Sequence, residues 1–122
     1  MNTILVLDDS PTMVMSLSRI LSKSGYAVET AANGKDGMDK LKAGVKPNLI
    51  LTDLNMPVMD GIAFIKEVRK LPPTRFTPIV VLTTESVTGK QTEARAAGAS
   101  GWLTKPTQPD DLIKTIKQLL PA

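Results

Sequence analysis

Short apolar runs alternate with longer amphipathic stretches along the chain, and this alternation repeats five times. The runs are rich in Val, Ile and Leu, which is typical of β-strands. We expect strands at residues 4–7, 26–30, 49–52, 78–82 and 101–103. The first, third and fourth runs are almost continuously apolar, so these strands should be covered on both faces. The run at 26–30 contains Glu29 and Thr30, and we expect it at an edge of the sheet.

Between the runs, apolar residues recur every three or four positions, which predicts five helices. Proline and capping residues mark their starts, and glycine or proline marks most of their ends. The expected limits are 11–24, 34–45, 61–71, 86–97 and 109–120. The apolar face of the fourth helix consists mainly of Val87, Ala94 and Ala97. Such small side chains bury little area, so we expect this helix to be the least firmly anchored.

Five strand–helix pairs in 122 residues fit a single domain over residues 1–122. Regular alternation of this kind is typical of parallel strands joined by crossover helices. The fold class is therefore α/β, a doubly wound five-stranded parallel sheet with five helices. A closed eight-fold β/α barrel is excluded, because it needs about 200 residues or more.

The composition restricts the chemistry, because the chain contains neither cysteine nor histidine. Disulfides, thiol or histidine catalysis and zinc sites built from these residues are excluded. No apolar run is long enough to span a membrane, and the N-terminus does not resemble a signal peptide, so we expect a cytoplasmic protein. The net charge is only +3 and four residues are aromatic, so we expect no nucleic-acid binding.

Polar residues gather where the expected strands end. Asp8 and Asp9 follow the first strand, and Asp53 follows the third. Thr83 ends the fourth, and Lys105 comes just after the fifth. The carboxyl ends of parallel strands share one edge of the sheet, where α/β proteins bind ligands. Three carboxylates there repel one another unless a cation lies between them, and Mg²⁺ is the simplest cation that prefers oxygen ligands. Such a site suits a phosphoryl group, with an aspartate as its acceptor.

Each of these residues also has a structural interpretation. Asp8 or Asp9 could cap the first helix, and Asp53 could cap a turn in the following loop. Thr83 could be an ordinary hydroxyl at a strand end, and Lys105 a solvated side chain. The functional interpretation is favoured because these groups occur together at the ends of four of the five expected strands.

Four segments of the chain resemble the receiver domains of two-component response regulators. They are ILVLDDSPTM (4–13), LILTDLNMPVMDG (49–61), PIVVLTTES (78–86) and AAGASGWLTKP (96–106). Together they span nearly the whole chain, in the order and spacing of that family. The resemblance implies the strand order 2-1-3-4-5, a sensor histidine kinase as phosphodonor and Mg²⁺ as cofactor. It also implies no enzymatic activity beyond the protein's own phosphorylation and dephosphorylation.

The same resemblance assigns the acidic residues. Asp53 matches the phosphorylation site. Asp8 and Asp9 match the acidic pair that holds Mg²⁺ together with Asp53 and the backbone carbonyl of Asn55. The residues Met56-Pro57 and Gly61 match the loop that shapes the site.

The resemblance also assigns the residues that respond to the phosphoryl group. Thr83 and Lys105 match its binding groups, and with Asp53 they form the expected catalytic set. The Lys105–Pro106 peptide bond is expected to be cis. Trp102 occupies the place of a switch aromatic that is usually Tyr or Phe, and a purely structural tryptophan is the alternative.

We expect a stand-alone, monomeric receiver, because the chain stops just after the fifth helix. Segments at 76–78, 82–86 and 101–102 are similar to the chemotaxis branch, whose phosphorylated form binds a flagellar motor switch protein. That partner is expected on the surface formed by the fourth helix, the fifth strand and the fifth helix. The alternative is a stand-alone receiver or phosphorelay shuttle in a non-chemotaxis pathway. A more remote alternative is an aspartate-dependent phosphatase, which would need an aspartate where Asn55 stands.

Overall fold

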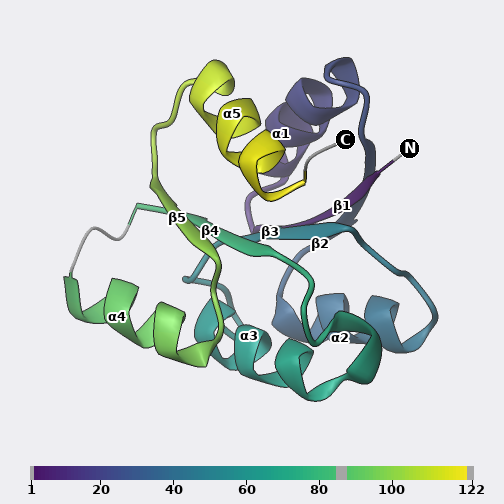
Figure 1. Cartoon of the computed structure of the whole chain (residues 1–122), viewed down its shortest axis with the longest axis vertical. Helices are drawn as coiled ribbons and strands as arrows, with labels where there is room; N and C mark the ends of the chain where they lie inside the picture. The colour runs from purple at the N-terminus through teal and green to yellow at the C-terminus, as the bar shows by residue number, and fades with distance from the viewer. Residues whose placement is uncertain (1, 85–87, 121–122) are drawn as a thin grey trace.

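The computed structural model describes residues 2–84 and 88–120 and contains one sheet flanked by helices (Figure 1). The strands are β1 (Thr3–Leu7), β2 (Ala27–Ala31), β3 (Leu49–Thr52), β4 (Ile79–Thr83) and β5 (Gly101–Thr104). The helices are α1 (Pro11–Lys23), α2 (Gly34–Lys42), α3 (Gly61–Lys70), α4 (Thr88–Ala97) and α5 (Pro109–Leu119), and a short 3₁₀ turn, η1 (Pro72–Thr74), follows α3. Every expected strand and helix is present. Within the described ranges, no helix is long and apolar enough to cross a membrane.

The sheet is parallel and has the order β2-β1-β3-β4-β5, as expected. β1 lies between β2 and β3, with Leu5 opposite Glu29 on one side and Ile50 on the other. The expectation that the polar strand lies at an edge is confirmed, and β5 forms the other edge. Because all strands run in one direction, their carboxyl ends meet at one edge of the sheet.

The helices cover both faces of the sheet, α1 and α5 on one and α2, α3 and α4 on the other (Figure 1). Alternating strand residues therefore enter two separate apolar clusters. Leu5 and Leu7 pack with Phe64 on the side of α2 and α3. Ile4 and Val6 pack with α1 and α5 on the opposite side. β1, β3 and β4 are buried almost completely, which agrees with their continuous apolar sequences.

The second helix is shorter than expected, and the prediction that it includes Val45 is wrong. α2 ends at Lys42 because Gly44 adopts the left-handed backbone, with φ of +110°. Val45 lies half-buried in the loop that follows.

The fourth helix has a weak apolar face, as expected. Among the α4 residues whose side chains are described, only Ala94 is buried, and Ala97 is half-buried. Val87 lies outside the described residues. Arg69 of α3 holds the far end of this helix, since its guanidinium donates hydrogen bonds to the carbonyl oxygen of Gly98 from Nε (3.2 Å) and Nη2 (2.7 Å).

Candidate functional site

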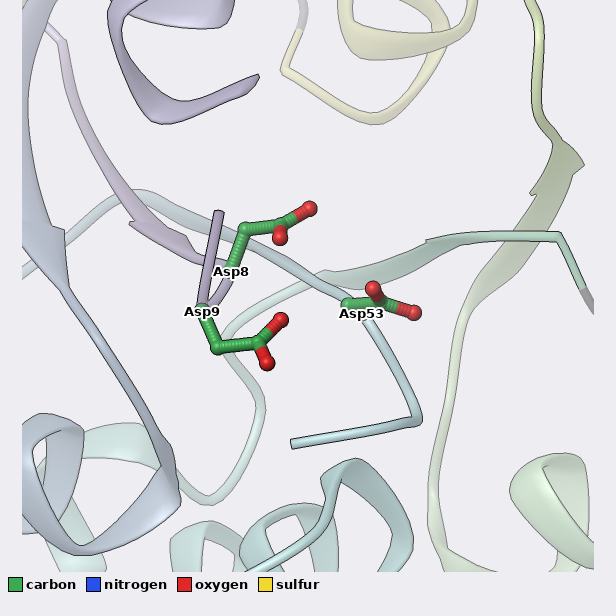
Figure 2. A group of neighbouring side chains, drawn as sticks. All are labelled: Asp8, Asp9 and Asp53. Atoms are coloured by element: carbon green, nitrogen blue, oxygen red, sulfur yellow. The ribbon is translucent and has the colours of Figure 1, made fainter. Parts of the chain in front are cut away.

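Asp8, Asp9 and Asp53 meet at the carboxyl edge of the sheet, as the sequence predicts. Asp8 and Asp9 follow β1, and Asp53 follows the neighbouring strand β3, where its N–H bonds the carbonyl oxygen of Leu7 (3.0 Å). One carboxylate oxygen from each residue lies within 4.8 Å of the other two. Figure 2 shows the three side chains extending side by side from these two strand ends.

The two neighbouring aspartates after β1 are held differently. Asp8 is buried, and its Oδ1 accepts a hydrogen bond from the N–H of Ser10 (3.0 Å). Asp9 is exposed and does not cap α1, because the N-cap is Ser10, whose Oγ accepts from the N–H of Met13 (3.3 Å). The interpretation that Asp8 or Asp9 caps the first helix is therefore wrong, and the Asp9 carboxylate remains beside the other two.

Asp53 is nearly buried and its two oxygens have different partners. Oδ1 accepts hydrogen bonds from the backbone N–H groups of Leu54 (2.7 Å) and Asn55 (3.4 Å). The expected turn-capping contact therefore exists. That contact uses only Oδ1. The other oxygen, Oδ2, accepts a hydrogen bond from Nζ of Lys105 (3.2 Å), so the same carboxylate also belongs to the polar cluster.

Lys105 joins the two buried carboxylates. Its Nζ lies 2.7 Å from Oδ2 of Asp8 and 3.2 Å from Oδ2 of Asp53, and its side chain is only 13% exposed. Burial alone would lower the pKa of Lys105, but hydrogen bonds and charge attraction from Asp8 and Asp53 outweigh it and raise the pKa above its usual value. Lys105 is therefore not a solvated side chain, and it stays protonated throughout the neutral range. The Lys105–Pro106 peptide bond is cis, as expected.

Thr83 and Trp102 lie on the two strands that lead to Lys105. Thr83 is the last residue of β4, is fully buried, and accepts a hydrogen bond at its carbonyl oxygen from the N–H of Lys105 (2.7 Å). Trp102 pairs with Val81 across the sheet and packs, partly buried, against the cluster on the side of α3. The roles of Thr83 and Trp102 as switch residues stay predictions, as does the Asn55 carbonyl as a metal ligand.

The loop from β3 to α3 fits tightly around Asp53. A Cβ atom at Gly61 would lie 2.2 Å from the carbonyl oxygen of Asp53, so only glycine fits there. The N–H of Gly61 donates to the carbonyl oxygen of Leu54 (2.9 Å). At its outer end the loop is bonded to α2, because the N–H of Gly34 donates to the carbonyl oxygen of Met59 (3.1 Å). This loop therefore fixes the backbone that carries the central carboxylate.

Val58, in the same loop, has a backbone conformation that the sequence does not predict. Its φ is +71°, in the left-handed region, although its side chain is β-branched and 78% exposed. Non-glycine residues rarely adopt this conformation, and a valine there is strained. No sequence signal could have revealed it, because the residue type argues against the conformation.

The donor set fits a hard divalent cation. Three carboxylates offer oxygen ligands within a few ångströms of one another, and no sulfur or imidazole donor from cysteine or histidine occurs in the chain. Lys105 supplies one positive charge against three negative ones, so a cation bound among the carboxylates would neutralise the remaining negative charge.

Comparison with known proteins agrees with this geometry. The family model described as response regulator receiver domain matches residues 4–117. The chain belongs to the response regulator receiver family. The receiver is 35% identical to Protein PilH of Pseudomonas aeruginosa over 120 residues, which are 98% of each chain.

Solved structures of receivers have the same fold. The chemotaxis protein CheY4 of Vibrio cholerae superposes with a TM-score of 0.93 at 42% identity, over 98% of both chains. The receiver domain of a Pseudomonas aeruginosa sensor histidine kinase superposes with a TM-score of 0.91 at 26% identity, over 99% of this chain and 98% of that one. That receiver domain has a magnesium ion coordinated in its active site cleft. In the present receiver, the cluster of Asp8, Asp9 and Asp53 could hold a metal ion.

Proposed function

We propose that this receiver accepts a phosphoryl group on Asp53 from a sensor histidine kinase and then changes its binding to a partner protein. The observation that carries the proposal is the position of Lys105, which contacts Asp53 and Asp8 while Asp9 completes a cluster of three carboxylates. The protein would catalyse only its own phosphorylation and dephosphorylation, in the cytoplasm and as a monomer.

Mg²⁺ is the proposed cofactor. Asp8, Asp9 and Asp53 would hold it, with the backbone carbonyl of Asn55 as a further ligand. When bound, it would neutralise charge on the incoming phosphoryl oxygens. The presence of magnesium in the similar kinase receiver supports this choice over other divalent ions.

In the proposed transfer, a carboxylate oxygen of Asp53 attacks the phosphorus of a phosphohistidine. The new O–P bond forms as the N–P bond breaks, and the electron pair of that bond returns to the imidazole nitrogen. Lys105 would then pair with a phosphoryl oxygen instead of the Asp53 carboxylate. Thr83 would donate its hydroxyl hydrogen to another phosphoryl oxygen, and such charge-assisted bonds are strong.

Incubation with acetyl phosphate and Mg²⁺ tests this proposal. Intact-mass measurement should show one added phosphoryl group, and Asp53→Asn should abolish it. Asp39→Asn, at an exposed carboxylate paired with Lys35, is the matched control and should be phosphorylated normally. A full mass increase in the Asp53 variant would overturn the assignment.

The proposed output surface consists of α4, β5 and α5, and the proposed partner is the flagellar motor switch. The similarity to the chemotaxis protein CheY4 supports the chemotaxis assignment. Trp102 and exposed lysines of α5, Lys114 and Lys117, are candidate contacts. Beryllofluoride with Mg²⁺, which mimics the phosphoryl group, should increase binding to purified motor switch protein. Equal binding with and without the mimic would favour the non-chemotaxis or phosphorelay alternative.

A further inference from the structure

Phe76 is an aromatic side chain that the fold does not use. It lies in the loop between η1 and β4 and is 88% exposed, whereas the other phenylalanine, Phe64, is completely buried. Leaving a large apolar ring in water is unfavourable, and aromatic residues are enriched at the centres of protein interfaces. Single exposed apolar residues are common, so exposure alone does not define a binding site.

Arg69 holds the backbone of the loop that carries Phe76 by hydrogen bonds. Nη1 of this guanidinium donates to the carbonyl oxygens of Thr74 (2.9 Å), Arg75 (3.1 Å) and Thr77 (2.7 Å), on both sides of Phe76. The same group bonds Gly98 at the end of α4. A side chain displayed on an ordered loop loses little conformational freedom when it binds, so its burial contributes more fully to affinity.

The surroundings of Phe76 are basic. The loops at this pole of the sheet, where the strands begin, are 24–26, 43–48, 71–78 and 98–100, all of which the structure describes. They contain Lys46 and Arg75 and neither Asp nor Glu. Lys70 adds a cation in the last turn of α3, where it pairs with Glu67 (3.0 Å).

We propose that Arg75 and Phe76 form a docking corner for an acidic, amphipathic segment of a partner protein. Carboxylates of that segment would pair with Arg75 and the neighbouring cations, and an apolar side chain would cover the ring of Phe76. A protein segment is favoured over an anionic membrane because one aromatic side chain is exposed here on a hydrogen-bonded loop, rather than an amphipathic helix or a flexible basic cluster.

The docking corner lies at the opposite end of the sheet from Asp53. β4 begins just after the corner and runs parallel to β3, so the length of five strand residues, about 16 Å, separates it from the phosphorylation edge. The corner also differs from the α4–β5–α5 surface. Binding there should therefore not require phosphorylation, and it would hold the receiver near its pathway in either state.

An NMR titration of the ¹⁵N-labelled full chain tests the proposal. The probe is an acetylated 12-residue peptide of Glu and Leu, with the Leu residues spaced to share one helical face. Amide shifts should concentrate at residues 74–77 and 98–100, with the same affinity in the presence of beryllofluoride and Mg²⁺. Phe76→Ala and Arg75→Glu should each weaken binding at least fivefold.

Matched controls separate this corner from general charge attraction. Met15→Ala removes another exposed apolar side chain, on α1, and Lys114→Glu reverses a charge on α5, so both should bind like the wild type. A peptide with Ser in place of Leu should bind at least fivefold more weakly. Shifts centred on α4, β5 and α5, or equal binding by the Phe76 variant, would overturn the proposal. Phe76-dependent binding to phosphatidylglycerol vesicles without peptide binding would also overturn it, in favour of a membrane surface.

Discussion

A few single residues determine the orientation of the Asp53 side chain and backbone. Its Oδ1 is occupied by two backbone N–H groups, its Oδ2 faces Lys105, and its own carbonyl oxygen lies against Gly61. The first two contacts restrict rotation of the Asp53 carboxylate, and the third restricts the position of its backbone. Together they favour a fixed geometry for attack on a phosphoryl donor. The site therefore depends on the residues that shape the backbone around Asp53, such as Gly61, as well as on its charged side chains.

Replacing Gly61 with alanine tests this view. The added Cβ would clash with the Asp53 carbonyl at 2.2 Å, so the free energy of unfolding should fall by about 2–3 kcal/mol. Phosphorylation by acetyl phosphate should slow as the loop shifts. Gly89→Ala is the control, because among the described residues no atom outside its own helix backbone and chain neighbours lies within 4 Å of the position that its added methyl group would take on α4. It should raise the stability by about 0.5 kcal/mol. Urea unfolding measures both, and equal midpoints for the two variants would contradict the prediction.

Val58 gives a second prediction at this scale. Asparagine tolerates the left-handed backbone better than valine, and the exposed valine side chain contributes little burial. Val58→Asn should therefore raise the free energy of unfolding by about 1 kcal/mol. Val58→Thr, which keeps the branched Cβ, should leave thermal unfolding unchanged. A lower melting temperature for the asparagine variant would show that the valine is not strained in solution.

Among the elements, α4 depends on polar contacts at its end more than on apolar packing. Its described side chains bury only Ala94, while Arg69 bonds both the carbonyl after the helix and the loop before β4. Burial lowers the pKa of the Arg69 guanidinium from its usual value, but an arginine stays charged at any physiological pH. With Gly98 fixed, a change near Thr83 would tilt α4 about its far end rather than displace the whole helix.

Removing this guanidinium should loosen two elements together. Arg69→Ala removes the guanidinium from four carbonyl groups, of which that of Thr74 keeps a hydrogen bond from the N–H of Thr77 (3.2 Å). The free energy of unfolding should therefore fall by about 2–3 kcal/mol. Amide hydrogen exchange should accelerate in the last turn of α4 and at residues 74–77, while β1 amides remain protected. Arg95→Ala, an exposed arginine on α4, should change the stability by less than about 0.5 kcal/mol. Unchanged exchange in the Arg69 variant would refute this coupling.

For the whole molecule, the apolar pattern was enough to predict the parallel sheet and the two layers of helices. It failed at Val45 because hydrophobic spacing continued past Gly44, where the backbone turned left-handed. The charged cluster was predictable because parallel strands must deliver Asp8, Asp53 and Lys105 to one edge. The hydrogen bonds of Arg69 were not predictable. They go to backbone carbonyl oxygens, and the positions of those oxygens cannot be inferred from residue types.

The assembled site gives a prediction for the whole fold. A cation that binds only the folded chain stabilises it by RT ln(1 + [L]/Kd), about 2.7 kcal/mol at a hundredfold excess over Kd. Mg²⁺ should therefore raise the melting temperature, and Asp9→Asn should remove most of the rise. Asp110→Asn, at an exposed first-turn position of α5, should keep it. Calorimetry with and without EDTA measures the effect, and identical curves would argue against a metal site.

The opposite charges at the two ends of the strands give the molecule an electric dipole along the sheet. Carboxylates cluster where the strands end, and the loops where they begin contain only cations among their charged residues. A phosphoryl group on Asp53 would add negative charge to the end that is already negative. In diffusional encounters, an anionic surface would meet the strand-start end first. The receiver would then arrive with its acidic edge turned outward, still open to a kinase.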